Sequence, residues 1–178
     1  MRLFLRLAMS CVATLIMVPG ASRAQDEPEP FTYTIGRKGT ATIEDGYRVF
    51  VALAVEQGRL KLDGKTSPGE LSFEELAAHL QALSVINPKW TYAPDQHLRR
   101  DVLAYMSASY MGVRPGLLTG VLGMTRRYAH REMLYRQVIA PGAPGTFVSG
   151  SELLSVAGRV ARRTGPDRNV KLTEDEIH

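Results

Sequence analysis

The sequence has 178 residues, with 22 Lys and Arg against 18 Asp and Glu and a single cysteine. This length allows one domain with a hydrophobic core of its own. A single cysteine excludes a disulfide within the chain, a cysteine-based zinc site and an iron–sulfur cluster.

The first 24 residues have the pattern of a secretory signal peptide. Arg2 and Arg6 accompany an apolar run over residues 7–18, residues 19–20 break this run, and small residues lead to Ala24. This order predicts cleavage after Ala24. The apolar run is also too short to span a bilayer comfortably. We therefore expect an exported protein, periplasmic or extracellular, with no transmembrane anchor after cleavage.

Cleavage would change the charge of the chain. The signal peptide holds three arginines and no acidic residue, so the remaining 154 residues contain 19 basic and 18 acidic residues. This balance argues against a nucleic-acid partner. The charge is uneven, because eleven arginines and four acidic residues lie between Leu98 and Arg168. Such an excess is typical either of a surface for an anionic partner or of solvated helix faces.

Residues 25–41 are predicted to be an acidic spacer followed by an extended segment. Residues 25–30 are acidic and contain two prolines, a composition typical of disorder. Residues 31–35 alternate like a strand until Gly36 and Gly39 stop the pattern. Since no second strand pattern follows, we expect an isolated extended segment here.

From residue 42 onward apolar residues recur at helical spacing, which predicts five helices. The first begins after Thr42, which can form a capping box with Asp45, and it ends at Gly58. The second begins after Ser72, with Glu75 as its capping-box partner, and is expected to end at residues 87–88.

Three more helices are predicted in the second half of the chain. The third covers residues 98–111 and the fourth residues 126–137. The fifth begins at Ser149, where Glu152 can complete a capping box, and ends at residues 164–166. The residues expected to face the core are Tyr47, Phe50, Val51, Ala54, Phe73, Leu76, Ala77, Leu80, Leu83, Val102, Tyr105, Met106, Ser109, Ala129, Met133, Leu134, Leu153, Val156, Ala157 and Val160.

The glycine-rich stretch over residues 112–123 carries the apolar residues Leu117, Leu118, Val121 and Leu122. It is expected to be a short helix in the core or, if it is exposed, a contact with a membrane or a partner.

The sequence also contains an internal repeat. Residues 78–88 are echoed by residues 131–141 at an offset of 53, and each copy runs through Val-Ile-x-Pro into a loop and a further helix. Residues 43–53 resemble the helix that ends each copy. The predicted fold is therefore a compact all-α domain of two or two and a half helix–loop–helix repeats with an extended N-terminal segment. Its expected divisions are a signal peptide (1–24), a spacer (25–41), a helical domain (42–163) and a polar tail (164–178).

This order of elements resembles the S-layer homology repeat, over roughly residues 73–162. Residues 98–102 (Leu-Arg-Arg-Asp-Val) lie where that family has a Leu-Thr-Arg-x-Glu-like motif, with Arg100 at the arginine position and Val102 in place of glutamate. Residues 148–152 keep the polar cap and the glutamate, but Gly150 stands in place of arginine. The resemblance implies contact with cell-wall polysaccharide. The chain is also similar in build to a group of uncharacterised exported bacterial proteins.

No constellation for catalysis is apparent in the sequence. Neither a Gly-x-Ser-x-Gly elbow nor a phosphate-binding glycine loop is present, and the four histidines include no pair at metal-binding helical spacing. We therefore expect no catalytic residues, no metal and no cofactor.

Two groups of residues are candidates for binding. Trp90 and Tyr92 lie on a loop, where they could stack on a sugar ring or cover the core. The second group consists of arginines, which suit bidentate contact with carboxylate or phosphate but also suit a solvated helix face. These arginines are Arg99, Arg100, Arg126, Arg127 and Arg131, followed by Arg159, Arg162 and Arg163.

The sequence thus predicts a non-catalytic binding or structural module of the cell envelope that contacts acidic wall polysaccharide, through Trp90, Tyr92, Arg99, Arg100, Arg127 and Arg131. Two alternatives stay open. One is a subunit or adaptor that binds another envelope protein, and the other is an enzyme with a dispersed site.

Overall fold

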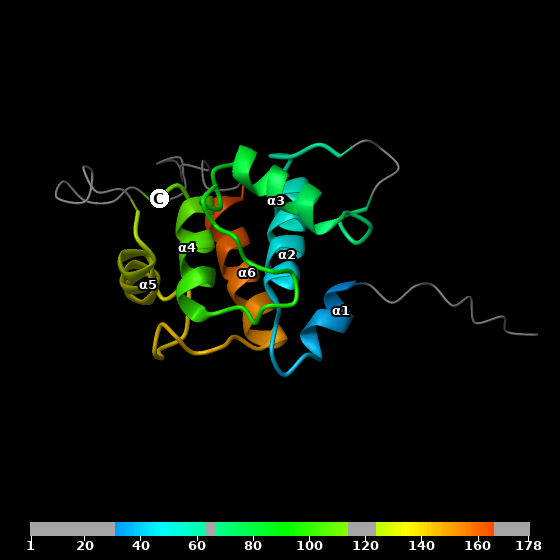
Figure 1. Ribbon diagram of the computed structural model, residues 1–178. Helices are drawn as coiled ribbons and strands as arrows, with labels where there is room; N and C mark the ends of the chain where they lie inside the picture. Colours follow the sequence, from blue (N-terminus) through cyan, green and yellow to red (C-terminus); the bar gives the residue numbers. More distant parts are fainter. Residues whose placement is uncertain (1–30, 63–66, 114–123, 166–178) are drawn as a thin grey trace, which may run out of the picture.

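The computed structural model describes residues 31–62, 67–113 and 124–165, and within these ranges it contains six helices and no sheet (Figure 1). The predicted all-α fold is confirmed. The helices are α1 (Phe31–Gly36), α2 (Ile43–Glu56), α3 (Phe73–Ala82), α4 (Arg100–Tyr110), α5 (Arg126–Tyr135) and α6 (Gly150–Thr164).

The longer helices α2, α4 and α6 form the centre of the molecule, and each carries one shorter helix on its outer side. Helix α6 contacts both α2 and α4, while α3 packs on α2, α5 on α4 and α1 on α6 (Figure 1). Because α1 packs on the last long helix rather than on the helix that follows it, the chain closes into a ring of three helix–loop–helix units: α1–α2, α3–α4 and α5–α6.

A cycle of backbone hydrogen bonds lies where the three units meet. The amide of Ala41 donates to the carbonyl of Val148 (2.8 Å), that of Leu98 to Ala41 (2.8 Å) and that of Val148 to Leu98 (3.0 Å). All three residues are completely buried. Each directly precedes the N-cap of a long helix, so the three units are related by an approximate threefold axis.

The first amide of each long helix donates to a loop carbonyl of a different unit, which satisfies a group that a helix start leaves free. These hydrogen bonds are Ile43 N–H to Gln96 C=O (2.8 Å), Arg100 N–H to Thr146 C=O (2.9 Å) and Gly150 N–H to Lys38 C=O (3.0 Å).

The internal repeat predicted from the sequence is confirmed by the way in which α3 and α5 end. Ser84 and Gln137, which are 53 positions apart, adopt left-handed conformations with φ of 56° and 55°. The next amides, of Val85 and Val138, donate back to the third residue from each helix end (2.8 and 2.9 Å), forming Schellman motifs. Helix α3 therefore ends at Ala82, earlier than the proline at position 88 suggested.

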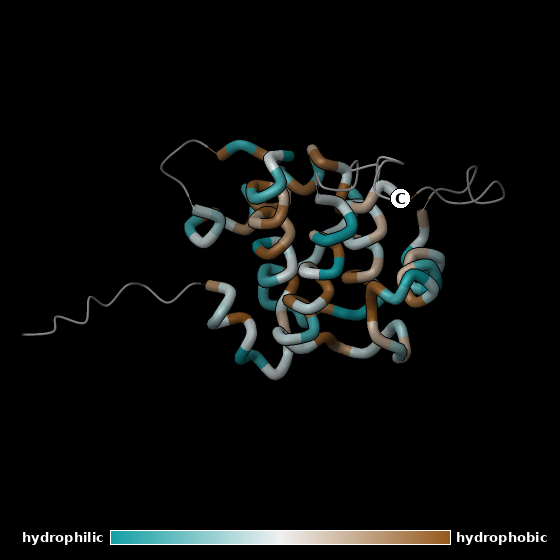
Figure 2. The backbone as a smooth tube through the Cα atoms, turned by 180° about the vertical axis from the view of Figure 1, so that it is seen from behind, coloured by the Kyte–Doolittle hydropathy of each residue, from teal (hydrophilic) through white to brown (hydrophobic). Residues whose placement is uncertain are grey.

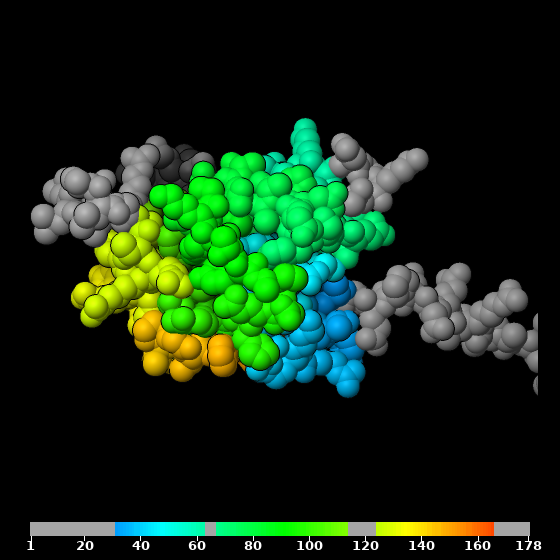
Figure 3. All heavy atoms as spheres, in the orientation of Figure 1, coloured from blue at the N-terminus to red at the C-terminus, as the bar shows by residue number. Residues whose placement is uncertain are grey.

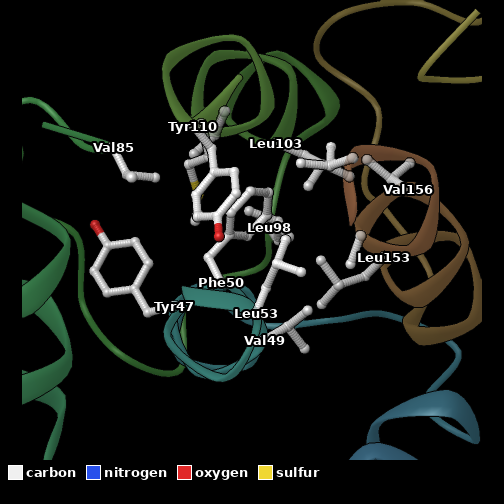
Figure 4. Packing of buried hydrophobic residues seen from close by; sticks show 14 of the residues in the cluster. Tyr47, Val49, Phe50, Leu53, Val85, Leu98, Leu103, Tyr110, Leu153 and Val156 are labelled. Atoms are coloured by element: carbon white, nitrogen blue, oxygen red, sulfur yellow. The ribbon is translucent and has the colours of Figure 1, made fainter. Parts of the chain in front are cut away.

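The hydrophobic core lies between the long helices and beneath the loops. In Figure 4, Phe50 of α2 lies beside Tyr110 of α4 and Leu98, while Leu103 of α4 lies beside Val156 of α6. Seen from behind, the central helices carry many hydrophobic residues, whereas α5 is mostly hydrophilic (Figure 2). None of the described helices is long and apolar enough to cross a membrane.

The expected extended segment is wrong for residues 31–36, which form α1. Phe31 and Ile35 are four residues apart, so they share one face of a helix, and Ile35 is buried in the core. Packing against α6 thus overrides the alternating pattern, and the helical domain begins before residue 42. The predictions for the signal peptide, residues 25–30, the apolar part of 112–123 and the tail beyond Gly165 lie outside the described residues.

Helix α4 is buried on more sides than its sequence pattern indicated. Leu103, Ala104 and Ser107 are fully buried, whereas Tyr105 and Ser109, which were expected to face inward, are half-buried. The reason is that α4 packs on both α5 and α6, so a single apolar stripe does not describe its environment.

Candidate functional site

Trp90 and Tyr92 lie in the loop before α4, and both are half-buried. The Trp90 ring lies 4.9 Å from the Tyr105 ring of α4 and 5.3 Å from the Tyr92 ring, measured between centroids. The two aromatics therefore cover α4 with part of their surface and keep part of it in contact with solvent.

Next to this aromatic pair, two arginines share one buried carboxylate. Asp101 in the first turn of α4 is 6% exposed. Its Oδ1 lies 3.3 Å from Arg99 Nε, and its Oδ2 lies 3.7 Å from Arg126 Nη1. The side chains of Arg99 and Arg126 are 41% and 42% exposed. Two cations and one anion leave an excess positive charge at a surface that solvent can reach.

A hydrogen bond joins the arginines to the aromatic pair. Arg126 Nη1 donates to Tyr92 Oη over 2.8 Å. We call this group the Trp90–Arg126 surface; it consists of Trp90, Tyr92, Arg99, Asp101 and Arg126. The residues from 90 to 101 precede or begin α4, whereas Arg126 begins α5 and lies 34 positions beyond Tyr92. No local pattern in the sequence could have shown that Arg126 and Tyr92 meet.

Arg100 points away from this surface and toward α6. Its Nε and Nη2 donate to the two carboxylate oxygens of Glu152 over 3.1 and 2.9 Å, and its side chain is only 13% exposed. The predicted capping box at Ser149 is therefore only half formed. Ser149 accepts the amide of Glu152 (3.1 Å), but the Glu152 carboxylate binds Arg100 instead of closing the box.

Arg127 and Arg131 lie on the exposed side of α5. Arg131 lines a hollow of about 310 Å³ together with Tyr128, Glu132 and Tyr135. The described contacts do not connect these two arginines with the Trp90–Arg126 surface. Of the sequence candidates on α6, Arg159 donates to the carbonyl of Val138 over 3.0 Å and so holds the end of the α5 turn.

His130 of α5 is buried close to the same region. Burial lowers the pKa of its imidazole, and the positive charge of Arg100 lowers it further, while Asp101 and the Gly142 carbonyl act in the opposite direction. Its Nε2 has no hydrogen-bond partner. The net effect lowers the pKa and so favours the neutral imidazole over the charged one.

The described residues include no group of three or more His, Cys, Asp or Glu that could hold a metal ion. Burial raises the pKa of the Tyr47 and Tyr110 hydroxyls to about 12, so both stay protonated at neutral pH. The Trp90–Arg126 surface places aromatic rings and guanidinium donors side by side.

Comparison of the chain with family models, curated proteins and solved structures gave no match.

Proposed function

We propose that this protein is an exported, non-catalytic binding module of the cell envelope whose Trp90–Arg126 surface binds acidic polysaccharide. One observation supports the proposal most directly. Arg99 and Arg126, both half-exposed, form ion pairs with the same buried carboxylate of Asp101. Arg126 also donates a hydrogen bond to Tyr92, whose ring lies beside that of Trp90. Asp101 fixes the position of both guanidinium groups without neutralising both of them.

The chemistry of an acidic sugar matches this arrangement. Guanidinium groups donate paired hydrogen bonds to carboxylate or phosphate groups. The ring of an aromatic side chain offers an apolar face to the apolar face of a sugar, while Tyr92 adds a polar edge. Arg100, which is committed to Glu152, is assigned no contact with the ligand.

Arg100, which lies at the arginine position of the motif that resembles the S-layer homology repeat, binds Glu152 in this chain. Export rests on residues 1–24. Amino-terminal sequencing of the protein from its native host should begin at Gln25, and full-length protein recovered from the cytosol would contradict this part of the proposal.

The binding test is sedimentation with purified cell-wall material. The protein should be retained at low salt and released as salt rises, because exposed charge contacts are screened. Trp90→Ala and Arg126→Gln should each weaken retention several-fold.

Arg37→Gln is the matched control, since Arg37 is an exposed arginine of the chain that lies over the Tyr33 ring beside α1. Equal retention of Arg126→Gln and Arg37→Gln would show that general positive charge, rather than this surface, is responsible. Absence of retention at low salt would overturn the proposal.

A second candidate function is an adaptor that binds another envelope protein through α5. The observation in its favour is Tyr135, which is 85% exposed beside Arg131, because tyrosine and arginine are enriched in protein interfaces. Tyr135→Ser should leave retention by cell-wall material unchanged if the polysaccharide proposal is correct.

A further inference from the structure

A second aromatic pair lies near the threefold axis, outside the Trp90–Arg126 surface. Phe147 is 58% exposed, and its ring lies 5.2 Å from that of His97 at an angle of 64°. His97 is also exposed. Both residues directly precede an axis residue, Leu98 or Val148, so they occupy equivalent positions in two of the three units.

Arg99 connects this second pair with the Trp90–Arg126 surface. Its backbone is paired with that of Phe147 in an antiparallel bridge. Its Nη2 lies 3.6 Å from the place that a Cβ on Gly145 would occupy, and the same side chain forms the ion pair with Asp101. The guanidinium of Arg99 is therefore situated between the loop of Phe147 and the buried carboxylate.

The space-filling view shows that these parts adjoin on one face. In Figure 3 the loop before α4 (green), α5 (yellow) and the loop before α6 (orange) form a continuous surface. Neighbouring contacts run along it from Trp90 through Tyr92, Arg126, Asp101 and Arg99 to the loop of Phe147.

We propose that the ligand is an extended acidic polysaccharide that occupies both aromatic pairs at once, with its anionic groups on Arg99 and Arg126 between them. This inference rests on the proposed function and adds that several consecutive sugars, rather than one terminal sugar, are bound. The reason is that Phe147 is 58% exposed, so that much of its ring surface is accessible to a sugar ring outside the protein.

Affinity should consequently depend on the length of the ligand. A short oligosaccharide can contact Trp90 and the arginines, whereas a longer one also contacts Phe147 and His97. A further aromatic contact predicts an affinity about fivefold higher for the longer chain.

The experiment uses the fluorescence of Trp90, which is the sole tryptophan of the sequence. The full mature chain is titrated with galacturonate oligosaccharides, a disaccharide and an octasaccharide, and with neutral glucose oligosaccharides of the same lengths. The variants are Phe147→Ala and, as the control, Tyr33→Ala, which removes an aromatic of similar exposure (52%) from α1. Thermal unfolding checks that both variants are folded.

We expect the wild type and Tyr33→Ala to bind the octasaccharide more tightly than the disaccharide. Phe147→Ala should bind both galacturonate lengths equally, at the disaccharide affinity. Binding of both lengths with one affinity, unaffected by Phe147→Ala, would overturn the extended-ligand inference while the proposed function stands. A loss of disaccharide binding in Phe147→Ala would overturn it as well, because the two pairs would then form one site. If no galacturonate oligosaccharide binds, or neutral ones bind equally well, the proposed function itself fails.

Discussion

Gly150, the first residue of α6, lies where the backbone at the end of α1 crosses the start of that helix. A Cβ built on Gly150 would lie 1.7 Å from the Ile35 carbonyl oxygen and 3.3 Å from that of Lys38. Both atoms belong to the backbone and cannot move out of the way as a flexible side chain can. Gly150 occupies the position that Arg100 has in the second unit. The close backbone of α1 explains why the third unit has a glycine where the second unit has an arginine.

Gly150→Ala should therefore lower the free energy of unfolding by about 2 kcal/mol, since α1 must shift to make room. Gly39→Ala is the control, because nothing lies within 4 Å of a Cβ at that position. Urea unfolding followed by circular dichroism measures both. Equal stability of the two variants would mean that α1 does not lie against the start of α6.

His130 predicts a pH dependence of stability. Burial and the nearby Arg100 lower its pKa in the folded state, so the folded protein holds a neutral imidazole where the unfolded chain takes up a proton below pH about 6.5. The contribution of His130 is therefore fully present above that pH, and stability falls as the pH falls toward its lowered folded pKa. Asp101 and the hydrogen bond to the Gly142 carbonyl raise the pKa of His130 and so moderate the effect.

His130→Asn should flatten the fall in stability between pH about 7 and pH about 5. The measurement is urea unfolding at several pH values, with His97→Asn, which removes an exposed imidazole, as the control. If His130→Asn follows the same pH profile as the wild type, the imidazole is not responsible.

At the scale of elements, the helices begin and end through local hydrogen bonds. Thr42 and Ser72 form complete capping boxes with Asp45 and Glu75, as predicted from the sequence. Hydrogen bonds from the Ser72 backbone and side chain lower the pKa of Glu75. The stabilisation by this carboxylate is therefore present above its ordinary pKa and is lost as the pH falls through the lowered value.

Ser72→Ala and Ser149→Ala should each lower the free energy of unfolding by about 1 kcal/mol, because each removes the acceptor for an amide in the first turn of a helix. Ser155→Ala, at an exposed position inside α6, is the control and should change stability by less than about 0.5 kcal/mol. Thermal unfolding of the three variants measures the differences in stability. Unchanged stability in both cap variants would mean that the helices do not begin at Ser72 and Ser149.

At the scale of the whole molecule, the packing of both α1 and α2 on α6 closes the ring. The units α3–α4 and α5–α6 follow one another along the chain, but the contact between α1 and α6 joins its two ends. Ile35 of α1 is 3% exposed and belongs to the common core. The first unit, which looked like a partial copy in the sequence, thus supplies its own short helix.

Ile35→Ala should cost about 3 kcal/mol of unfolding free energy if α1 completes the ring, because it leaves a cavity beside α6. Tyr33→Ala, on the exposed side of the same helix, should cost much less. Denaturant unfolding of both variants provides the comparison. A negligible effect of Ile35→Ala would mean that α1 is an appendage rather than part of the fold.

The sequence by itself determined the features that depend on neighbouring residues. These features are the helical spacing of apolar residues, the capping boxes at Thr42 and Ser72, and the repeated Val-Ile-x-Pro turn. Each depends on residues only a few positions apart, and the structure contains each of them. Trp90 and Tyr92 could be identified as candidates because they are aromatic residues on a predicted loop, although the sequence alone did not show whether they cover the core or contact a ligand.

Only the tertiary structure decided how distant segments meet. Three features depend on closure of the ring: the helical conformation of α1, the ion pair between Arg100 and Glu152, which are 52 positions apart, and the hydrogen bond between Arg126 and Tyr92. An arginine in the sequence can pair with any acid that the fold brings near it, and residues 31–35 fit a strand or a helix equally well. Packing between the units removes both alternatives. The helical form of residues 31–36 buries Ile35 against α6, and the packing of α4 on α6 brings Glu152 to Arg100.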